Sequence, residues 1–421
     1  YNVYAQKLNT TGAPQWAANG VLISSSTSSA VNYDISMVSD GAGGAIIGWT
    51  CVVGSANQNY YRRILTGGTM GYAQSPMSVL GSTGSRFMQL VVSATAGNAI
   101  AVWRDTVDGE TSIYAARVLD TGSLQWGPTC IRASAQAIQT EPVAYSDGAN
   151  GAYVVWKDYS YGVNPIISAN LVRNNGALPW GGYGVPVSMA AYVASPTQMC
   201  NKRDTRVVLT GADVIIAWVD DRSGKFDVYA QRLTAALGAR QFTGANLDGQ
   251  AVCTVAPEVG RTGLVMCRDN ASGAICAWVE EALIDGHKHV RARRFSATMT
   301  YPWGTGATQT AGQTIDNTSG QDKSELSITP GADSGAVIAW MRTTAASGYD
   351  IRAQRVVAAG TVQWTANGLA VCISSNNQTG PVVVGYPDFS YYVCAWSDNR
   401  SSNADIYAAR VSGAGVVLGA T

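Results

Sequence analysis

The stretch SDGAGGAIIGW, residues 39–49, joins a turn-forming segment to an unbroken apolar run that ends in tryptophan. Its apolar half recurs six more times, as NAIAVW, GAYVVW, DVIIAW, GAICAW, GAVIAW and YYVCAW, which end at Trp103, Trp156, Trp218, Trp278, Trp340 and Trp396. Successive copies lie 54, 53, 62, 60, 62 and 56 residues apart. A fixed internal period indicates a repeat architecture, and this period is closer to a propeller blade than to a solenoid coil.

The other five tryptophans occupy a second position of the repeat, twelve residues after the start of a YAQRL-like segment. They are Trp16, Trp126, Trp180, Trp303 and Trp364, with Tyr72 and Phe242 in two further copies. Each repeat divides into four short strands separated by turn residues. The turns SDGAGG and SDGANG contain the Asp and Gly that tight hairpins require.

The second strand of each repeat is apolar at successive positions, which predicts that both of its faces are buried. Radially arranged sheets, each packed between two neighbours, meet that requirement. The sequence therefore predicts an all-β fold, a seven-bladed β-propeller of four-stranded antiparallel blades with about 60 residues per repeat. An open β-solenoid of the same units is the alternative.

Residues 31–421 hold the seven repeats and are predicted to form one domain. Residues 1–30 are predicted to be a half-repeat, with YAQKL as a third strand and GVLIS as a fourth. The chain thus has eight third strands for seven second strands. Ring closure, strand exchange with a neighbouring molecule, a loose extension and a longer array all remain open as explanations.

The composition of the chain limits the classes of partner and the location that can be expected for it. The chain has 28 basic and 28 acidic residues and no basic stripe, which argues against nucleic acid. No run of eighteen apolar residues occurs, so no membrane insertion is predicted. Loops rich in Ser, Thr, Asn and Gly favour an extracellular or cell-surface location. Most of the eight Cys are predicted to be small buried hydrophobes, with a Cys267–Cys276 disulfide as the one alternative.

The repeats resemble those of secreted bacterial β-propeller proteins with units of the form D-I-Y-A-Q-R-L, G-x-x-x-W-x-x-x-G-V-x-V and S-D-G-x-G-G-A-I-x-A-W-x-D. The resemblance is strongest at residues 39–49, 227–233, 361–374 and 396–411, and it extends over essentially the whole chain. It implies the propeller fold and an exported surface or matrix protein, mostly of unknown function. It implies no particular chemistry.

Catalytic motifs are sparse, and no catalytic residue is predicted. The chain has two His, His287 and His289, which lie on one face of a strand beside Asp285 and are predicted as a metal site. A polar strand edge beside a turn is the alternative interpretation. Asp220, Asp227, Asp398 and Asp405 are candidate calcium ligands, or else they cap turns and pair with Arg. No other cofactor is predicted.

Two loops depart from the repeat by carrying aromatic residues, which can stack on sugars or anchor protein partners. The candidate ligand-binding residues are Tyr159, Tyr161, Tyr386, Phe389 and Tyr391. The interpretation favoured by the sequence is a non-enzymatic extracellular structural or binding module, for adhesion, a surface coat or an assembly. Its partners would be other protein subunits or surface glycans. The alternative is a carbohydrate-active hydrolase or lyase with its site on one face of the propeller.

Overall fold

The computed structural model describes residues 2–24, 31–53, 56–73, 75–77, 82–93, 95–132, 138–189, 201–242, 247–253, 259–281, 285–303, 311–344 and 348–419. The named elements in these ranges are all β-strands, which confirms the all-β prediction. They form seven four-stranded antiparallel sheets and one two-stranded sheet. Each four-stranded sheet has one Trp-ending segment as its second strand, so one repeat builds one sheet.

The chain folds into two compact units, Tyr1–Thr197 with Leu233–Arg240, and Gln198–Arg232 with Gln241–Thr421. The sheets of the first unit are β1 (Tyr4–Ala5) and β2 (Val21–Leu22); β3 (Val31–Ser39), β4 (Ala45–Val53), β5 (Ala56–Ile64) and β6 (Ser75–Met77); β7 (Ser82–Val92), β8 (Ala99–Val107), β9 (Glu110–Val118) and β10 (Leu124–Cys130); and β11 (Gln139–Ser146), β12 (Ala152–Asp158), β13 (Ile166–Val172) and β14 (Val185–Ser188).

The sheets assigned mainly to the second unit are β15 (Lys202–Thr210), β16 (Asp213–Asp220), β17 (Asp227–Thr234) and β18 (Gln250–Ala251); β19 (Arg261–Arg268), β20 (Gly273–Glu281), β21 (Lys288–Ser296) and β22 (Gln313–Asp316); β23 (Lys323–Pro330), β24 (Ala336–Thr344), β25 (Gly348–Val356) and β26 (Leu369–Cys372); and β27 (Gln378–Gly385), β28 (Tyr391–Asp398), β29 (Asp405–Ser412) and β30 (Val417–Leu418).

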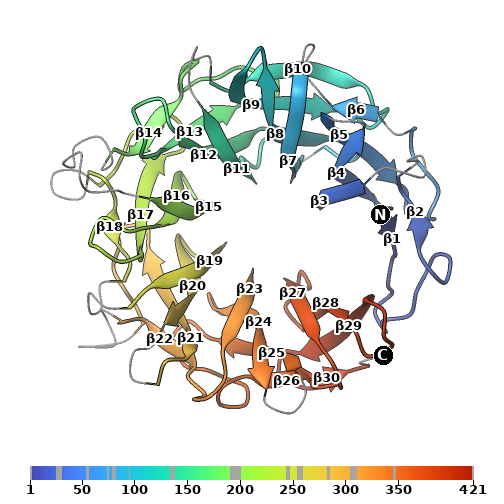
Figure 1. Ribbon diagram of the computed structural model, residues 1–421, viewed down its shortest axis with the longest axis vertical. Coiled ribbons are helices and arrows are strands. Elements are labelled where there is room, and N and C mark those ends of the chain that lie inside the picture. Colours follow the sequence, from blue (N-terminus) through green and yellow to red (C-terminus); the bar gives the residue numbers. More distant parts are fainter. Residues whose placement is uncertain are drawn as a thin grey trace. The chain divides into compact units, whose positions relative to one another are not determined.

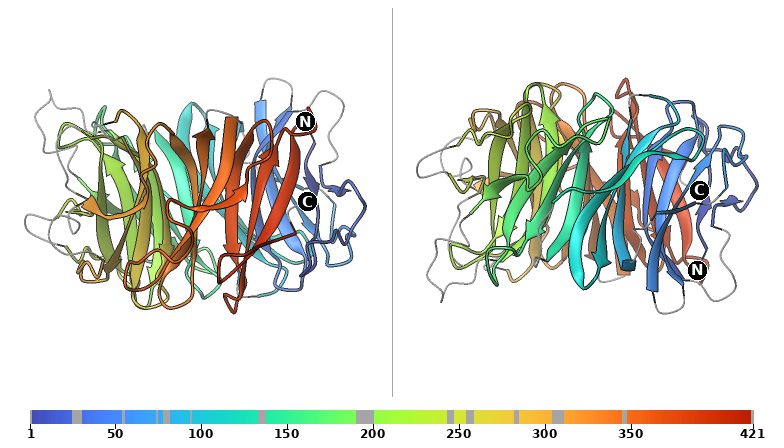
Figure 2. Two further views of the ribbon diagram at one scale, coloured as in Figure 1. Left: turned by 90° about the horizontal axis from the view of Figure 1, so that it is seen from below. Right: turned by 90° about the horizontal axis from the view of Figure 1, so that it is seen from above.

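Within each unit, consecutive sheets pack face to face in chain order, first strand beside first strand (Figure 1). The side views show the sheets of each unit on edge, with turns at both ends of the strands (Figure 2). Because a sheet between two neighbours has no face toward water, its second strand is buried on both sides, as residues 273–280 of β20 are. This packing explains the absence of alternation in the apolar runs.

The tryptophan at the end of each second strand is fully buried. In four sheets its indole stacks on the Tyr of the third strand, as Trp103 does on Tyr114 with ring centres 6.1 Å apart. Burial of so large an apolar side chain contributes on the order of 3 kcal/mol. The first position of the repeat is therefore a packing position between sheets.

The tryptophan of the second position ties one sheet to the next. The indole N–H of Trp126 donates to the carbonyl oxygen of Asn174 in the β13–β14 turn, at 2.7 Å. Gly176 of that turn has φ +82°, and a Cβ there would lie 3.1 Å from the Trp126 ring. This turn position requires a left-handed backbone conformation and has no room for a side chain, which explains the recurring Gly.

The last sheet departs from the prediction that every second strand is buried on both faces. Burial alternates along β28, with Tyr392, Cys394 and Trp396 inside and the intervening residues partly exposed. On the same face as those intervening residues, Val382 and Val384 of β27 are exposed. The buried face packs on the preceding sheet, because Tyr392, Cys394 and Trp396 share one apolar cluster with Val337 and Ala339 of β24.

The described cysteines are all free thiols, and all but Cys130 are buried, as predicted for small core residues; Cys200 lies outside the described residues. The alternative of a Cys267–Cys276 disulfide is wrong. Across the β19–β20 ladder, Cys267 faces Ile275 while Cys276 faces Met266. The two thiols are one position out of register and therefore point to opposite faces of the sheet.

Candidate active site

The loop that enters β21 is organised by Asp285. Its Oδ1 accepts the backbone N–H of His287 at 3.0 Å, and its Oδ2 lies 3.2 Å from Nε2 of His289. Gly286 between them has φ +71°, which closes the turn. The hydrogen bond from His287 N–H is the main reason why the pKa of Asp285 is lowered, so this carboxylate is ionised at neutral pH.

A second carboxylate reaches the loop from the β22–β23 connection. Oδ1 of Asp322 accepts the backbone N–H of Lys288 at 3.0 Å and lies 3.4 Å from Nδ1 of His287. The Asp322 backbone is held in place by Thr343 of β24, whose N–H donates to the Asp322 carbonyl at 2.8 Å. We call Asp285, His287, His289 and Asp322 the His-Asp cluster.

A buried charged layer lies next to the His-Asp cluster. Asp316 accepts the indole N–H of Trp340 at 3.0 Å, and it pairs with Lys323 at 3.7 Å and Arg342 at 3.5 Å. Burial lowers the pKa of Lys323, while the negative charges of Asp316, Asp285 and Asp322 act in the opposite direction. Because Lys323 and Arg342 share the single carboxylate of Asp316, this layer has one more basic than acidic side chain.

Asp316, Asp322 and Lys323 were not predicted from the sequence. One feature of the sequence could have indicated that a carboxylate from another segment is needed beside Trp340. In three other sheets the indole N–H of the second-strand Trp donates to an Asp two residues later, as Trp103 does to Asp105. Trp340 is followed at that distance by Arg342, so the missing carboxylate had to come from elsewhere in the chain.

The two His differ in access to solvent. The His287 side chain is 34% exposed and its Asp322 partner 48%, whereas the His289 side chain is 11% exposed. His289 thus fixes the loop, and His287 is the imidazole that a ligand can reach. An accessible imidazole oriented by a carboxylate is the usual arrangement for general acid–base chemistry near neutral pH.

The metal site predicted from Asp285, His287 and His289 stays a prediction. Asp285 and His289 do come together, but the His287 ring turns to Asp322 instead. Among the residues that the structure describes, which here exclude 282–284, no group of three or more His, Cys, Asp or Glu side chains is placed to hold a metal ion.

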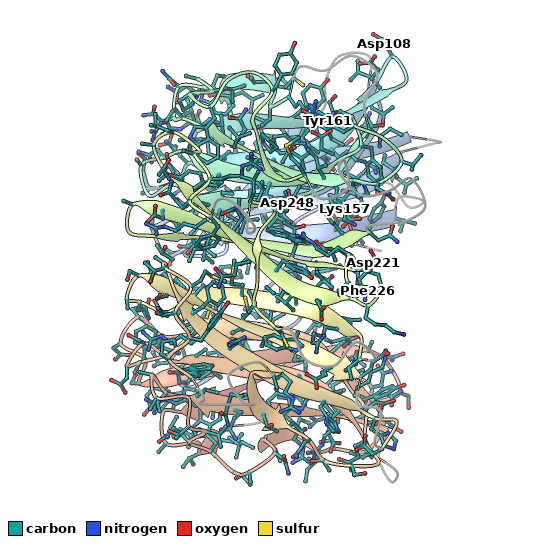
Figure 3. All side chains as sticks on the ribbon, turned by 90° about the vertical axis from the view of Figure 1, so that its left-hand side faces the viewer. Asp108, Lys157, Tyr161, Asp221, Phe226 and Asp248 are labelled. Carbon is teal, nitrogen blue, oxygen red and sulfur yellow. The ribbon has the colours of Figure 1, made fainter. Side chains whose placement is uncertain are left out.

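The aromatic residues predicted in the first unit lie in the loop after β12 (Figure 3). Tyr161 is exposed, and the Arg132 guanidinium lies 5.8 Å from its ring centre. Tyr159 is half-buried, and burial, together with the charge of Glu141, raises its pKa. Nearby, Nζ of Lys157 pairs with Glu141 at 2.7 Å. A role for these tyrosines in ligand binding stays a prediction.

The aromatic residues predicted in the second unit lie in the β27–β28 turn and contact one another. Tyr386 and Tyr391 meet edge to face with ring centres 6.1 Å apart. Phe389, at φ +55°, packs against the adjacent apolar core. All three are half-buried, so these rings cover part of the sheet. Their binding role also stays a prediction.

The aspartates predicted as calcium ligands make other contacts. Asp398 accepts the Trp396 indole N–H at 2.9 Å and pairs with Arg400 at 2.6 Å. Asp220 does the same with Trp218 and Arg222, Asp227 pairs with Arg261, and Asp405 accepts the Ser401 hydroxyl. These contacts agree with the alternative interpretation, in which the aspartates cap turns and pair with Arg.

No protein-family model and no curated protein sequence matches the chain, so the resemblance to secreted bacterial propeller repeats is still an expectation. Solved structures do resemble it. A polysaccharide lyase of family PL25, an ulvan lyase bound to -[GlcA(1-4)Rha3S]-, aligns with a TM-score of 0.53 at 9% identity over 89% of this chain and 91% of the lyase.

Two arabinan-cleaving enzymes also align, at lower scores. An α-L-arabinofuranosidase from Fusarium graminearum has a TM-score of 0.37 at 9% identity over 79% of this chain and 93% of its own. An α-L-arabinanase from Penicillium chrysogenum has a TM-score of 0.37 at 10% identity over 75% and 90%. Of these three, only the lyase aligns with a TM-score above 0.5, and this likeness shows a shared β-propeller fold.

The prediction of a non-enzymatic structural or binding module is corrected by this comparison. The solved structure that the chain resembles with a TM-score above 0.5 is an enzyme, the polysaccharide lyase. A passive module was preferred from the sequence because no catalytic motif is present, and a site assembled from separate loops has no motif. Among the described residues, no helix has the length and apolar character of a membrane-spanning segment.

Proposed function

We propose that this protein is a polysaccharide lyase, built as a seven-bladed β-propeller, in which His287 is the general base. The observation that carries the proposal is the placement of His287, whose Nδ1 faces Asp322 at 3.4 Å while about a third of the side chain stays open to solvent. A proton on Nδ1, directed at Asp322, leaves Nε2 as the acceptor.

The chemistry that fits this arrangement is β-elimination on a uronic acid. Nε2 of His287 would take the proton from the carbon next to the sugar carboxylate. The electron pair left behind forms a carbon–carbon double bond as the glycosidic C–O bond breaks, and the leaving oxygen takes up a proton from water. Stabilisation of the negative charge that builds on the sugar carboxylate requires nearby positive charge, and Lys323 and Arg342, which share Asp316, contribute to it.

A hydrolase fits the His-Asp cluster less well. Glycoside hydrolysis uses two carboxyl groups, one of them held protonated by a raised pKa. The pKa of Asp285 is instead lowered by the hydrogen bond from His287 N–H. Asp285 is therefore not prepared as a general acid.

The shared fold with an enzyme on acidic polysaccharide supports this choice of substrate class. The chain would act on glycans in an extracellular or cell-surface location, where such polymers occur. The seven-bladed count rests on seven four-stranded sheets, one for each repeat from residue 31 onward, in the described part of the chain.

The test is incubation of the intact protein with a panel of uronate-containing polysaccharides, with two readouts. Ultraviolet absorbance of the unsaturated uronate reports elimination, and a reducing-end assay reports any cleavage. We expect both signals together, and we expect His287→Gln to lower the rate at least about a hundredfold.

The matched control is Lys225→Gln, which changes an exposed residue in the corresponding loop, between β16 and β17. Its activity should equal that of the parent protein. Reducing ends without absorbance would replace the lyase by a hydrolase. Full elimination activity in His287→Gln would remove His287 from the mechanism.

A further inference from the structure

Arg203, in the first strand of its sheet, departs from the repeat. The strand registers align it with a small hydroxyl residue in four other sheets, namely Thr140, Thr262, Ser324 and Thr379. A guanidinium at this position is therefore not required to build a sheet. A residue that departs from the repeat is a better candidate for ligand binding than one that recurs in every copy.

The Arg203 side chain is held in one position by Phe226 and Arg261. Its guanidinium carbon lies 3.5 Å from the centre of the Phe226 ring, which is a cation–π contact. Its Nη2 donates to the backbone carbonyl of Arg261, the first residue of β19, at 3.1 Å. The N–H of Arg261 donates to the carbonyl of Phe226 at 3.0 Å, so the ring and the guanidinium are both anchored to Arg261 in the next sheet.

Arg203 and Arg261 differ in their charge partners. Arg261 is fully buried and pairs with Asp227. Arg203 is half-buried, and no carboxylate of the described residues, which here exclude 243–246 and 254–258, lies within ion-pair distance of it. The neighbouring Asp204 instead accepts the N–H of Gly263 at 2.8 Å. A guanidinium that is oriented but not paired with a carboxylate is prepared to bind an anionic ligand.

Arg203 lies at the same end of the strands as the His-Asp cluster, one sheet earlier in the second unit. Phe226 ends the β16–β17 loop (Figure 3), and His287 ends the corresponding β20–β21 loop. The two sheets pack together through β15 and β19. The β19–β20–β21 ladder places Arg261 two strands from His289. Two strand spacings, about 10 Å, therefore separate the contact point of Arg203 from β21.

We propose that Arg203 binds an acidic group of the polysaccharide, on a sugar other than the one that His287 deprotonates. This inference rests on the proposed function and adds a specificity to it, because the substrate would carry a carboxylate or sulfate on a second sugar. The separation of about 10 Å exceeds the length of one sugar ring, so the two residues contact different units of the polymer. Phe226 is a positioning residue, since it orients the guanidinium.

The test measures binding separately from cleavage, in the full chain with His287→Gln to suppress turnover. Fluorescence anisotropy follows three end-labelled oligosaccharides with one backbone: glucuronan, its neutral carboxyl-reduced form, and that neutral form after sulfation. We expect Arg203→Gln to weaken binding of an acidic probe at least about tenfold, and this difference should shrink at high salt. An effect on glucuronan identifies the bound group as a carboxylate, and an effect on the sulfated probe identifies it as a sulfate.

Three further variants test the geometry. Phe226→Leu should weaken binding several-fold, because the guanidinium loses the ring that orients it, whereas Phe226→Tyr should bind as the parent does. Arg268→Gln is the matched control, since it removes an exposed guanidinium at the other end of β19, and it should leave binding unchanged. Thermal unfolding checks that each variant is folded.

The outcomes separate this inference from the proposed function. Elimination activity with the same KM in Arg203→Gln as in the parent would overturn the inference and leave the lyase in place. Arg203-dependent binding of an acidic probe without any elimination would support the inference and contradict the lyase. The inference is also overturned if neither acidic probe binds, or if Arg203→Gln binds both as tightly as the protein with Arg203. Arg203→Lys, which keeps the charge but not the planar donors, should fall between the two.

Discussion

Arg355 and Trp364 donate to the same atom. Nη1 of Arg355 lies 2.9 Å, and Nε1 of Trp364 3.2 Å, from the carbonyl oxygen of Gly413 in the turn of the next sheet. The pattern recurs with Arg294 and Trp303 on Ala358, and with Arg117 and Trp126 on Asn174. The basic and aromatic residues of the repeat therefore hydrogen-bond together to one carbonyl of the next sheet. This shared structural contact explains why both positions recur along the chain.

Because Arg355 and Trp364 share one acceptor, substitutions of the two residues should have coupled effects on stability. Trp364→Phe and Arg355→Met should each lower the free energy of unfolding by about 1 kcal/mol, because each removes a donor to a carbonyl that keeps one partner. The double variant should lose more than the sum, since the carbonyl is then left without either donor. Guanidinium unfolding measures all four proteins. Strict additivity would show that the two contacts are independent.

Gly415→Ala should destabilise the protein by more than about 2 kcal/mol. Gly415 has φ +82°, and a Cβ there would lie 2.5 Å from the Trp364 ring. The control is Gly211→Ala, at φ +60° with no atom within 4 Å of the added Cβ, which carries backbone strain alone and should cost about 1 kcal/mol. Equal losses in the two variants, measured by thermal unfolding, would contradict the steric explanation.

The lowered pKa of Asp398 predicts that the protein loses stability in acid. Burial raises the pKa of this carboxyl, but hydrogen bonds from Arg400 and Trp396 outweigh burial and lower it to about 2. Because the folded pKa is below the unfolded value, the contribution is complete above about pH 4 and disappears as the pH falls toward about 2.

The measurement for Asp398 is chemical unfolding of the parent and Asp398→Asn across that pH range. The variant should be about 2 kcal/mol less stable near neutrality, and the difference should shrink as the pH falls toward about 2. A constant difference at every pH would show that the carboxylate charge is not what stabilises the fold.

Asp322 is predicted to act through His287 as a positioning residue. Asp322→Asn should reduce kcat at least about tenfold with a smaller change in KM, because the His287 ring loses the carboxylate that orients it. Asp322→Glu should restore part of the rate. Asp333→Asn, in an exposed turn of the same unit, is the control and should leave kcat and KM unchanged.

Cys267 and Cys276 should be unreactive in the native protein. Burial raises the pKa of both thiols, so little thiolate forms near neutral pH. An aromatic disulfide reagent should therefore label neither one until denaturant is added, and both should then react. Peptide mapping under non-reducing conditions would detect a Cys267–Cys276 bridge, which would contradict their placement on opposite faces of the sheet.

Much of the fold could be predicted from the sequence because its signals are local. The apolar run ending at Trp156 marks a buried strand, and the Gly and Asp of residues 146–151 mark its hairpin turn. β28 shows the limit of this approach. Its sequence is as apolar as the others, yet its burial alternates, because burial depends on packing between sheets and not on the local sequence alone.

The candidate site was predicted only in part. The spacing of His287 and His289 and the nearness of Asp285 are visible in the sequence, because all three belong to one turn. Asp322 lies 35 residues from His287, in another connection, and no local pattern links the two. The His-Asp cluster could therefore not be recognised from the sequence, because it depends on that one carboxylate.

The sequence by itself determined the repeat, its four strands, and the buried tryptophan in each copy, because side-chain periodicity acts over a few residues. Only the tertiary structure decided which carboxylate each histidine meets and why Cys267 and Cys276 cannot pair. Those outcomes depend on the register between strands and on the order in which sheets stack. Both are set by contacts between segments that are distant in the chain, which no local pattern encodes.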